Sequence, residues 1–378
     1  MEVFRHIRYA TAKRFEEPVL AELSTVGAIA DKPTACYQNA LRLGFLLGDT
    51  EPLSLTEDCQ FLSIWTPSCE GDYPVLVWIH GGAYIAGTGE EAAYDGAELC
   101  RQGNMVVVTI SYRLGVFGYL YNEEKGVVNL GLKDQLMALR WVKAHIARFG
   151  GDPEKITLAG HSAGGHSVAA ILSSCNEPLF RRAIIQSAPL SMRSSRQDGN
   201  TLFRQFLNAA GKPLEELTSD ETLEAQKTVL SYSKSMMPLG PIEPDFTGKT
   251  TVGSLGKVLV TWQKDDAAPF VALALKHQQH FGNAIDKIAT HFATKKVFGA
   301  PAKQYAKALN AQGVPAEVRC LDWRPQGSPF GACHFLELAL LFGSWKRWEG
   351  TKMLGQTSYT EWEDRSKQLR AEWISFIE

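Results

Sequence analysis

One short segment, residues 155–174, constrains the fold of this chain more than any other part of its sequence. It reads KITLAGHSAGGHSVAAILSS, with a β-prone run, a G-H-S-A-G turn and then an apolar pattern of helical spacing. This strand–turn–helix order is the context in which a G-x-S-x-G motif holds a nucleophile on a tight, strained turn. A side chain at Gly160 or Gly164 would collide with the neighbouring strand or helix. The segment therefore predicts a nucleophilic hydroxyl at Ser162, next to a helix N-terminus that stabilises a developing oxyanion.

A second motif lies about 80 residues upstream, where residues 75–84 read VLVWIHGGAY. The apolar run 75–79 is typical of a buried strand, and it ends at small residues that let the backbone approach a substrate. Acyl transfer requires backbone N–H groups that point at the tetrahedral oxyanion, and an H-G-G-x loop supplies them. The alternative for this motif alone is a flexible turn after a strand. Together, the two motifs predict the nucleophile and the oxyanion loop of an acyl-transfer site.

Five segments of the chain resemble the type-B carboxylesterase/cholinesterase-like family of the α/β-hydrolase fold. They are FRHIRYATAKRFEEP (4–18), EDCQFLSIWTP (57–67), ISYRLGVFGYL (110–120), LGLKDQLMALRWVKAHIARFGGDPEKITLAGHSAG (130–164) and FRRAIIQSA (180–188). The resemblance implies a single α/β-hydrolase domain over 1–378, with a mostly parallel central sheet flanked by helices. The chain resembles a shortened member of the family, with residues 191–245 as a reduced helical cap or lid. The alternation of helix and strand patterns over 130–190 also favours a parallel sheet.

The resemblance assigns the catalytic base to His334. This histidine lies in GACHFLEL, which is similar to the family's G-x-x-H-x-x-E-L. A serine nucleophile requires such a base, which accepts its proton. His166 follows the nucleophile too closely on the elbow helix to reach across the site. The other histidines after Ser162 lie on polar helical faces, where we expect them to be solvated; they are His277, His280 and His291.

The acid of the triad is assigned by the same resemblance to Asp266. The family has K-D-E-G after a strand, and here Lys264-Asp265-Asp266-Ala267 follows the strand predicted over 257–262. Because aspartate is one methylene shorter than glutamate, the loop must approach the histidine more closely. The alternatives left open are the neighbouring Asp265 and, more distantly, Asp245 and Asp286.

The oxyanion donors of the family correspond to the backbone N–H groups of Gly82, Ala83 and Ala163, with Gly81 supporting the turn. His161 stands where the family usually has a glutamate beside the nucleophile. Two interpretations of His161 remain open: a group that titrates near neutral pH, or a neutral side chain packed under the site.

Residues 191–245 combine a polar run, amphipathic helix patterns over 201–210 and 219–230, and a Met/Pro/Gly segment. Met236 and Met237 could line an adaptable acyl or alcohol site, or they could be ordinary packing residues. Four charged residues in the family motifs are expected to form structural ion pairs, Arg14 with Glu57 and Arg113 with Asp134.

Composition limits the other functions that this chain could have. A hydrophobic fraction of 45%, a charged fraction of 21% and a formal net charge of −2 give no electrostatic footprint for nucleic acid or an anionic membrane. No apolar run approaches the roughly 18–20 residues of a membrane span, and the N-terminus has no apolar signal region. Seven scattered cysteines provide neither a disulfide framework nor metal-ligand spacing. We therefore expect a cytoplasmic monomer or homodimer with free thiols, without metal or cofactor, that acts on a small-molecule ester.

The function predicted is that of a serine carboxylesterase working through a Ser-His-Asp triad and an acyl-enzyme. One alternative is a biosynthetic enzyme of the same fold that performs acyl transfer, lactonisation or cyclisation. A non-catalytic adhesion protein is disfavoured, because Ser162 and His334 are both present.

Overall fold

The computed structural model of the protein describes residues 1–23, 33–48, 51–233, 235, 237–244, 247–248, 250–253, 255–276 and 280–378. The main sheet contains β1 (Glu2–Arg8), β6 (Phe61–Thr66), β7 (Tyr73–Ile79), β8 (Val106–Ile110), β9 (Gly151–His161), β10 (Arg182–Gln186), β11 (Lys257–Gln263) and β12 (Ala316–Leu321). Within the described residues these eight strands lie in the order β1-β6-β8-β7-β9-β10-β11-β12. Two small sheets pair β2 (Ala10–Thr11) with β3 (Val19–Leu20), and β4 (Thr34–Cys36) with β5 (Ser54–Thr56).

Most neighbouring strands of the main sheet are parallel. Strand β7 pairs in parallel with β8 and β9, and the parallel pairing continues through β10 and β11 to β12. The pairs β1–β6 and β6–β8 are antiparallel. The prediction of a mostly parallel central sheet is therefore confirmed.

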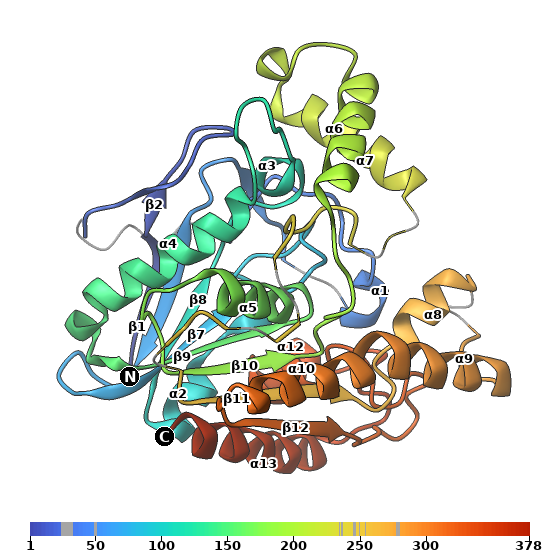
Figure 1. The fold of residues 1–378 in the computed structure, drawn as a ribbon. Helices are drawn as coiled ribbons and strands as arrows, with labels where there is room; N and C mark the ends of the chain where they lie inside the picture. Colours follow the sequence, from blue (N-terminus) through green and yellow to red (C-terminus); the bar gives the residue numbers. More distant parts are fainter. Residues whose placement is uncertain are drawn as a thin grey trace.

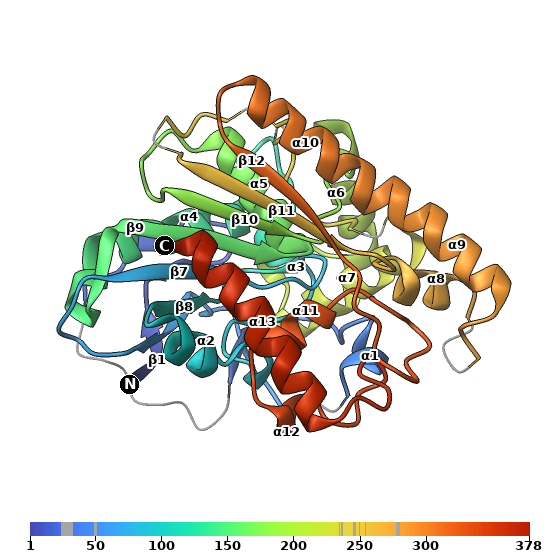
Figure 2. The same ribbon diagram turned by 90° about the horizontal axis from the view of Figure 1, so that it is seen from below.

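Helices cover both faces of the sheet. The helices of the described residues are α1 (Gly44–Leu47), α2 (Ala97–Gly103), α3 (Gly115–Tyr119), α4 (Leu130–His145), α5 (Ala163–Ser174), α6 (Arg196–Ala210), α7 (Ser219–Tyr232), α8 (Ala268–Ala274), α9 (Ala284–Thr294), α10 (Ala300–Ala311), α11 (Leu336–Leu341), α12 (Trp345–Trp348) and α13 (Tyr359–Ile377). Short 3₁₀ segments are η1 (Ala92–Tyr94), η2 (Ile146–Phe149) and η3 (Leu214–Glu216), and η4 (Lys295–Gly299) is a π-helical turn between α9 and α10. Helices α4, α5 and α10 lie on one face of the sheet, and α2 and α13 lie on the other (Figures 1 and 2).

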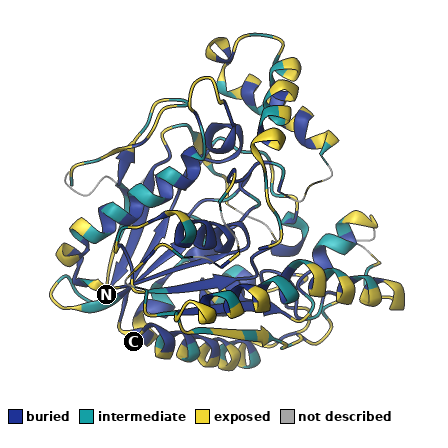
Figure 3. Cartoon of the chain, viewed as in Figure 1, coloured by how far each residue is buried: buried dark blue, intermediate teal, exposed yellow. Residues whose placement is uncertain are grey.

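The alternation of side chains along β7 shows how the sheet divides two hydrophobic cores. Val75, Val77 and Ile79 pack into the core that also contains the inward faces of α4 and α5. Leu76 and Trp78 point to the opposite side, into the core shared with α11 and α13. Strands buried on both faces appear dark blue through the centre of Figure 3, which explains why 75–79 is continuously apolar rather than alternating.

The segment 191–245 carries α6 and α7, which lie together beyond one end of the sheet (Figure 1). These helices correspond to the amphipathic patterns expected at 201–210 and 219–230. Helix α6 begins earlier than its apolar pattern, because Ser195 and Asp198 form a capping box at its N-terminus.

Both expected ion pairs are present. Arg113 Nη2 lies 2.7 Å from Asp134 Oδ1 with both side chains buried, and Arg14 Nε donates to Glu57 Oε2 at 2.8 Å at a half-buried site. Arg14 lies in the N-terminal segment and Arg113 also donates to Glu16 O at 2.7 Å, so both arginines hold that segment to the body of the fold. The seven cysteines are unbridged in this structure. Among the described helices, none is both long and apolar enough to cross a bilayer.

Candidate active site

Ser162 lies at the junction between β9 and α5, where the backbone turns sharply. Its φ of 56° and ψ of −120° are unfavourable for a residue with a β-carbon, so this turn is strained. A β-carbon at Gly160 would lie 2.5 Å from the backbone of Gly164, and one at Gly164 would lie 2.1 Å from Ile79 O. The amide of Ser162 donates to Gln186 O on the adjacent strand at 2.8 Å, which ties the turn to the sheet. The two glycines are thus required sterically, as the sequence indicated.

His334 and Asp266 come together from two loops at the same end of the sheet. Nδ1 of His334 lies 2.5 Å from Asp266 Oδ1, and the other carboxyl oxygen of Asp266 accepts from Gln263 N at 2.9 Å. Both side chains are buried. Nε2 of His334 has no hydrogen-bond partner among the described residues, so it remains available to accept a proton.

The alternative acids lie elsewhere. Asp265 accepts two hydrogen bonds from Arg324, at 2.7 and 2.9 Å, on the outer side of the same loop. Asp286 accepts the amides of Gly282 and Asn283 at the start of α9. Asp245 lies outside the described residues, as does His277. His280 and His291 are exposed, in agreement with the expectation from sequence.

The backbone of the H-G-G-A loop that follows β7 adopts conformations that few residue types can take. Gly82 has a φ of 110°, and a β-carbon there would lie 1.9 Å from Ala86 O. Ala83 has a φ of 55° in the left-handed region. Among the turns, loops and caps of the described residues, no hydrogen bond is donated by the amides of Gly82, Ala83 or Ala163. These N–H groups are therefore free to bind an oxyanion. Gly81 lies beneath the nucleophile, since its β-carbon would lie 3.2 Å from Ser162 Cβ.

A buried polar network behind the triad was not predicted. Glu337 accepts from Ser187 Oγ at 2.9 Å and from Gln263 Nε2 at 2.6 Å. Gln263 thus forms hydrogen bonds with two buried carboxyl groups, those of Glu337 and Asp266. The pattern H-x-x-E after His334 was the available signal for Glu337, because it places the carboxyl group in the first turn of α11, directly after the histidine.

Burial dominates the electrostatics of this network. It raises the pKa of Asp266 to about 7, and it raises the pKa of Glu337 to about 8 with a further contribution from the charge of Asp266. Burial therefore opposes ionisation of both carboxyl groups, and a charge on Asp266 further opposes ionisation of Glu337. Burial lowers the pKa of His334 to about 3, which keeps the imidazole in its neutral, proton-accepting form.

His161 is completely buried beside the triad histidine. The centroids of its ring and the His334 ring are 4.4 Å apart, and its Nε2 lies 3.8 Å from Glu337 Oε1. Burial, followed by the proximity of His334, lowers the pKa of His161 well below its ordinary value. Of the two interpretations from sequence, the structure therefore favours a neutral side chain packed under the site.

A cavity of about 410 Å³ contains both Ser162 and His334. Its other walls are mainly apolar and come from the oxyanion loop, α8, α9 and the residue after the triad histidine; they include Ile85, Phe270, Val271, Leu273, Ala293 and Phe335. From the segment 191–245, Ser233 and Ser235 reach it. Met237 lies in the hydrophobic core and is not among the described lining residues, and Met236 lies outside the described residues.

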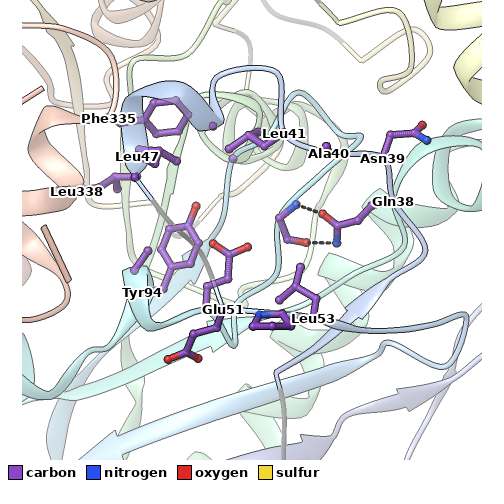
Figure 4. A pocket seen from close by; sticks show the side chains of 18 of the residues that line it. Gln38, Asn39, Ala40, Leu41, Leu47, Glu51, Leu53, Tyr94, Phe335 and Leu338 are labelled. Atoms are coloured by element: carbon purple, nitrogen blue, oxygen red, sulfur yellow. Dashed lines mark hydrogen bonds between the residues drawn. The ribbon is translucent and has the colours of Figure 1, made fainter. Parts of the chain in front are cut away.

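A second cavity of about 470 Å³ lies on the other side of the oxyanion loop (Figure 4). It shares Leu41, Gly82 and Phe335 with the first cavity. Gln38 on its wall forms hydrogen bonds with the amide and the carbonyl of Gly87, which fix the wall to the loop after the oxyanion motif. Among the described residues there is no cluster of three or more His, Cys, Asp or Glu side chains that could hold a metal ion.

Comparisons with known proteins agree with this geometry. A family model described as the carboxylesterase family matches residues 1–312. The chain is 32% identical to a probable N-octanoylanthranilate hydrolase of Rhodococcus erythropolis, over 99% of this chain and 88% of that protein. It is 31% identical to para-nitrobenzyl esterase of Bacillus subtilis, over 87% of this chain and 76% of the relative. The solved structure of a thermophilic PNB esterase has a TM-score of 0.85 and 27% identity, over 99% of this chain and 86% of that one.

Proposed function

This chain belongs to the carboxylesterase family and has the α/β-hydrolase fold, and from that premise we propose that it hydrolyses carboxylic esters through an acyl-enzyme formed on Ser162. The observation that supports this proposal best is the hydrogen bond between His334 Nδ1 and Asp266 Oδ1, in a cavity that Ser162 also lines. A nucleophile, a base and an acid that orients the base are the groups that serine hydrolysis requires.

Each group has one role in the proposed cycle. His334 Nε2 accepts the Ser162 hydroxyl proton as Ser162 Oγ attacks the ester carbonyl, and Asp266 stabilises the imidazolium that forms. The amides of Gly82, Ala83 and Ala163 donate to the oxyanion. His334 then protonates the leaving alcohol. Water attacks the acyl-enzyme, His334 accepts its proton, and the carboxylic acid and the free Ser162 hydroxyl are released.

The shape of the cavity supports an acyl group of medium length. Phe270, Val271 and Leu273 give the wall beside Ser162 an apolar character, and a volume of about 410 Å³ is typical of small-molecule sites. The Rhodococcus relative is named for a substrate with an octanoyl chain. We also propose that the segment 191–245 acts as a cap, since Ser233 and Ser235 border the cavity.

The test uses p-nitrophenyl esters from acetate to dodecanoate and a fluorophosphonate that labels activated serines. Wild type should turn over the esters, with kcat/KM highest at intermediate chain length, and should be labelled at Ser162. The Ser162→Ala variant should lose both activities and keep the far-UV circular dichroism of wild type. Turnover by Ser162→Ala close to that of wild type would refute the mechanism.

A further inference from the structure

Helix α9 has its apolar residues on the outside. Ile285, Ile288 and Phe292 are 72%, 59% and 65% exposed. With 100° per residue, they lie within an arc of about 60° on one side of the helix. We call these three residues the α9 apolar face. Large apolar side chains scattered singly over a surface are ordinary, whereas a stripe of them on one helix marks an interaction site.

The opposite side of the same helix is polar and buried. Asp286, Thr290 and Thr294 face the protein. Thr294 Oγ1 accepts the amide of Ala267 at 3.0 Å, and Asp286 accepts the amide of Gly282 at 2.9 Å. The hydrogen bond to Ala267, which precedes α8, holds α9 against that part of the protein, whereas the bond of Asp286 caps α9 itself. Turning the α9 apolar face inward would break the bond of Thr294 and expose the buried polar side chains of Asp286 and Thr290.

The chain on and around α9 is rich in lysine. Lys276, Lys287, Lys295 and Lys296 are exposed, and none of them has an ion-pair partner among the described residues. Between residues 267 and 316 the sequence contains six lysines and a single acid, the buried Asp286. The net charge of −2 for the whole chain averages this cluster with acidic residues elsewhere.

The helix that carries the α9 apolar face also borders the catalytic cavity, through a different residue. Ala293 on α9 lines that cavity, together with Phe270, Val271 and Leu273 on α8. Leu275, just after α8, is 42% exposed and extends the apolar surface beside the cavity. Both helices lie at the edge of the molecule in Figure 1, where a planar surface can approach them. An ester that leaves such a surface at α8 or α9 would meet the apolar walls of the cavity that Ser162 lines.

We propose that the α9 apolar face and its flanking lysines dock on an anionic lipid surface, from which apolar esters enter the catalytic cavity. Exposed apolar residues flanked by lysines are the pattern of helices that lie in the interface of an anionic bilayer. A second copy of this chain fits less well, because a symmetric contact would bring two sets of unpaired lysines together. The proposed docking surface is separate from the chemistry at Ser162, so it can be tested on an inactive enzyme.

The test is co-sedimentation of the Ser162→Ala protein with phosphatidylcholine vesicles that contain 30% phosphatidylglycerol, compared with pure phosphatidylcholine. Binding should be measurable on the anionic vesicles and weak on the neutral ones. The variant K287Q/K295Q/K296Q should bind about 100-fold more weakly, since each lysine near an anionic surface contributes roughly fivefold. The variant I285S/I288S/F292S should lose binding by at least about tenfold.

Matched controls separate this surface from general effects of charge or exposure. K13Q/K155Q/K227Q removes the same charge from exposed sites elsewhere, and Tyr232→Ser removes an apolar side chain that is 77% exposed. Both should bind as the parent protein does. In the active enzyme, the α9 variants should keep p-nitrophenyl acetate turnover and lose turnover of a long-chain ester embedded in anionic vesicles.

Four outcomes would overturn the proposal. The parent protein could fail to sediment with anionic vesicles, or it could bind neutral vesicles equally well. A loss of binding in the control variants as large as that in the α9 variants would also overturn it. A dimer in sedimentation equilibrium that I285S/I288S/F292S converts to monomer would show that a second copy covers this face instead. Failure of the esterase proposal would appear separately, as vesicle binding by a wild-type protein that hydrolyses no ester.

Discussion

Replacing Asp266 with asparagine tests the proposed triad most directly, because both carboxyl oxygens of Asp266 are in use. Oδ1 faces His334 Nδ1 at 2.5 Å, and Oδ2 accepts from Gln263 N at 2.9 Å. An asparagine has one acceptor and one donor in place of these two acceptors. If its oxygen faces His334, its NH₂ group opposes the Gln263 amide. If it flips, its NH₂ group opposes Nδ1 and forces the His334 proton onto Nε2, where it blocks proton transfer from Ser162.

We expect the second arrangement to be preferred, because the backbone amide of Gln263 has no other way to keep its hydrogen bond. The comparable change in a Ser-His-Asp triad lowers kcat about 10⁴-fold, which corresponds to about 5 kcal/mol of transition-state stabilisation. The assay is p-nitrophenyl butyrate hydrolysis at pH 7.5. Asp265→Asn is the matched control, since Asp265 pairs with Arg324 at the surface and should change kcat by less than about threefold. A loss below tenfold for Asp266→Asn, with a large loss for Asp265→Asn, would refute the assignment.

Three further predictions follow from particular contacts. Gly82→Ala places a β-carbon 1.9 Å from Ala86 O and should lower kcat by about 10²–10³-fold through loss of oxyanion geometry, measured with the same ester. Burial raises the pKa of Glu337 from 4.5 to about 8, so between these two pH values the folded protein binds a proton that the unfolded chain releases. Wild type should therefore lose stability as the pH rises from 4.5 to about 8, and Glu337→Gln should remove this loss. In urea unfolding, the free energy of unfolding of Glu337→Gln relative to that of wild type should rise by a few kcal/mol, in order of magnitude, between pH 5 and pH 9. A difference that does not change with pH would contradict the raised pKa. Arg113→Met leaves Asp134 buried and unpaired and should lower the free energy of unfolding by about 3–5 kcal/mol, whereas Arg113→Met combined with Asp134→Leu should recover much of that loss.

The turn that carries Ser162 could be predicted because its signal is local. Gly160, Ser162 and Gly164 lie within five positions, and the steric demand of that turn depends only on the strand and helix that flank it. The same holds for the oxyanion loop, which directly follows a buried strand. The ion pair of Arg113 with Asp134 was also predictable, although only through the resemblance to a family.

The choice between Asp265 and Asp266 was of a different kind. The two residues are adjacent, carry the same side chain and follow the same strand, so only the resemblance to the family's K-D-E-G favoured Asp266 over Asp265. In the structure one carboxyl group points inward to His334, 68 positions further along the chain, and the other points outward to Arg324. Glu337 was missed for the same reason, since its partners Ser187 and Gln263 lie on two other strands or their ends.

By itself, then, the sequence determined the strand–turn–helix that holds Ser162 and the loop that follows β7, because each depends on neighbours a few residues away, and its alternation of helix and strand favoured a mostly parallel sheet. Only the tertiary structure decided the order of the strands, the hydrogen bonds of the buried Glu337, and that α9 presents Ile285, Ile288 and Phe292 to the outside. These features depend on contacts between segments far apart in the chain and on the water that those contacts exclude. Burial and long-range packing are properties of the assembled fold, and no local pattern of residues specifies them.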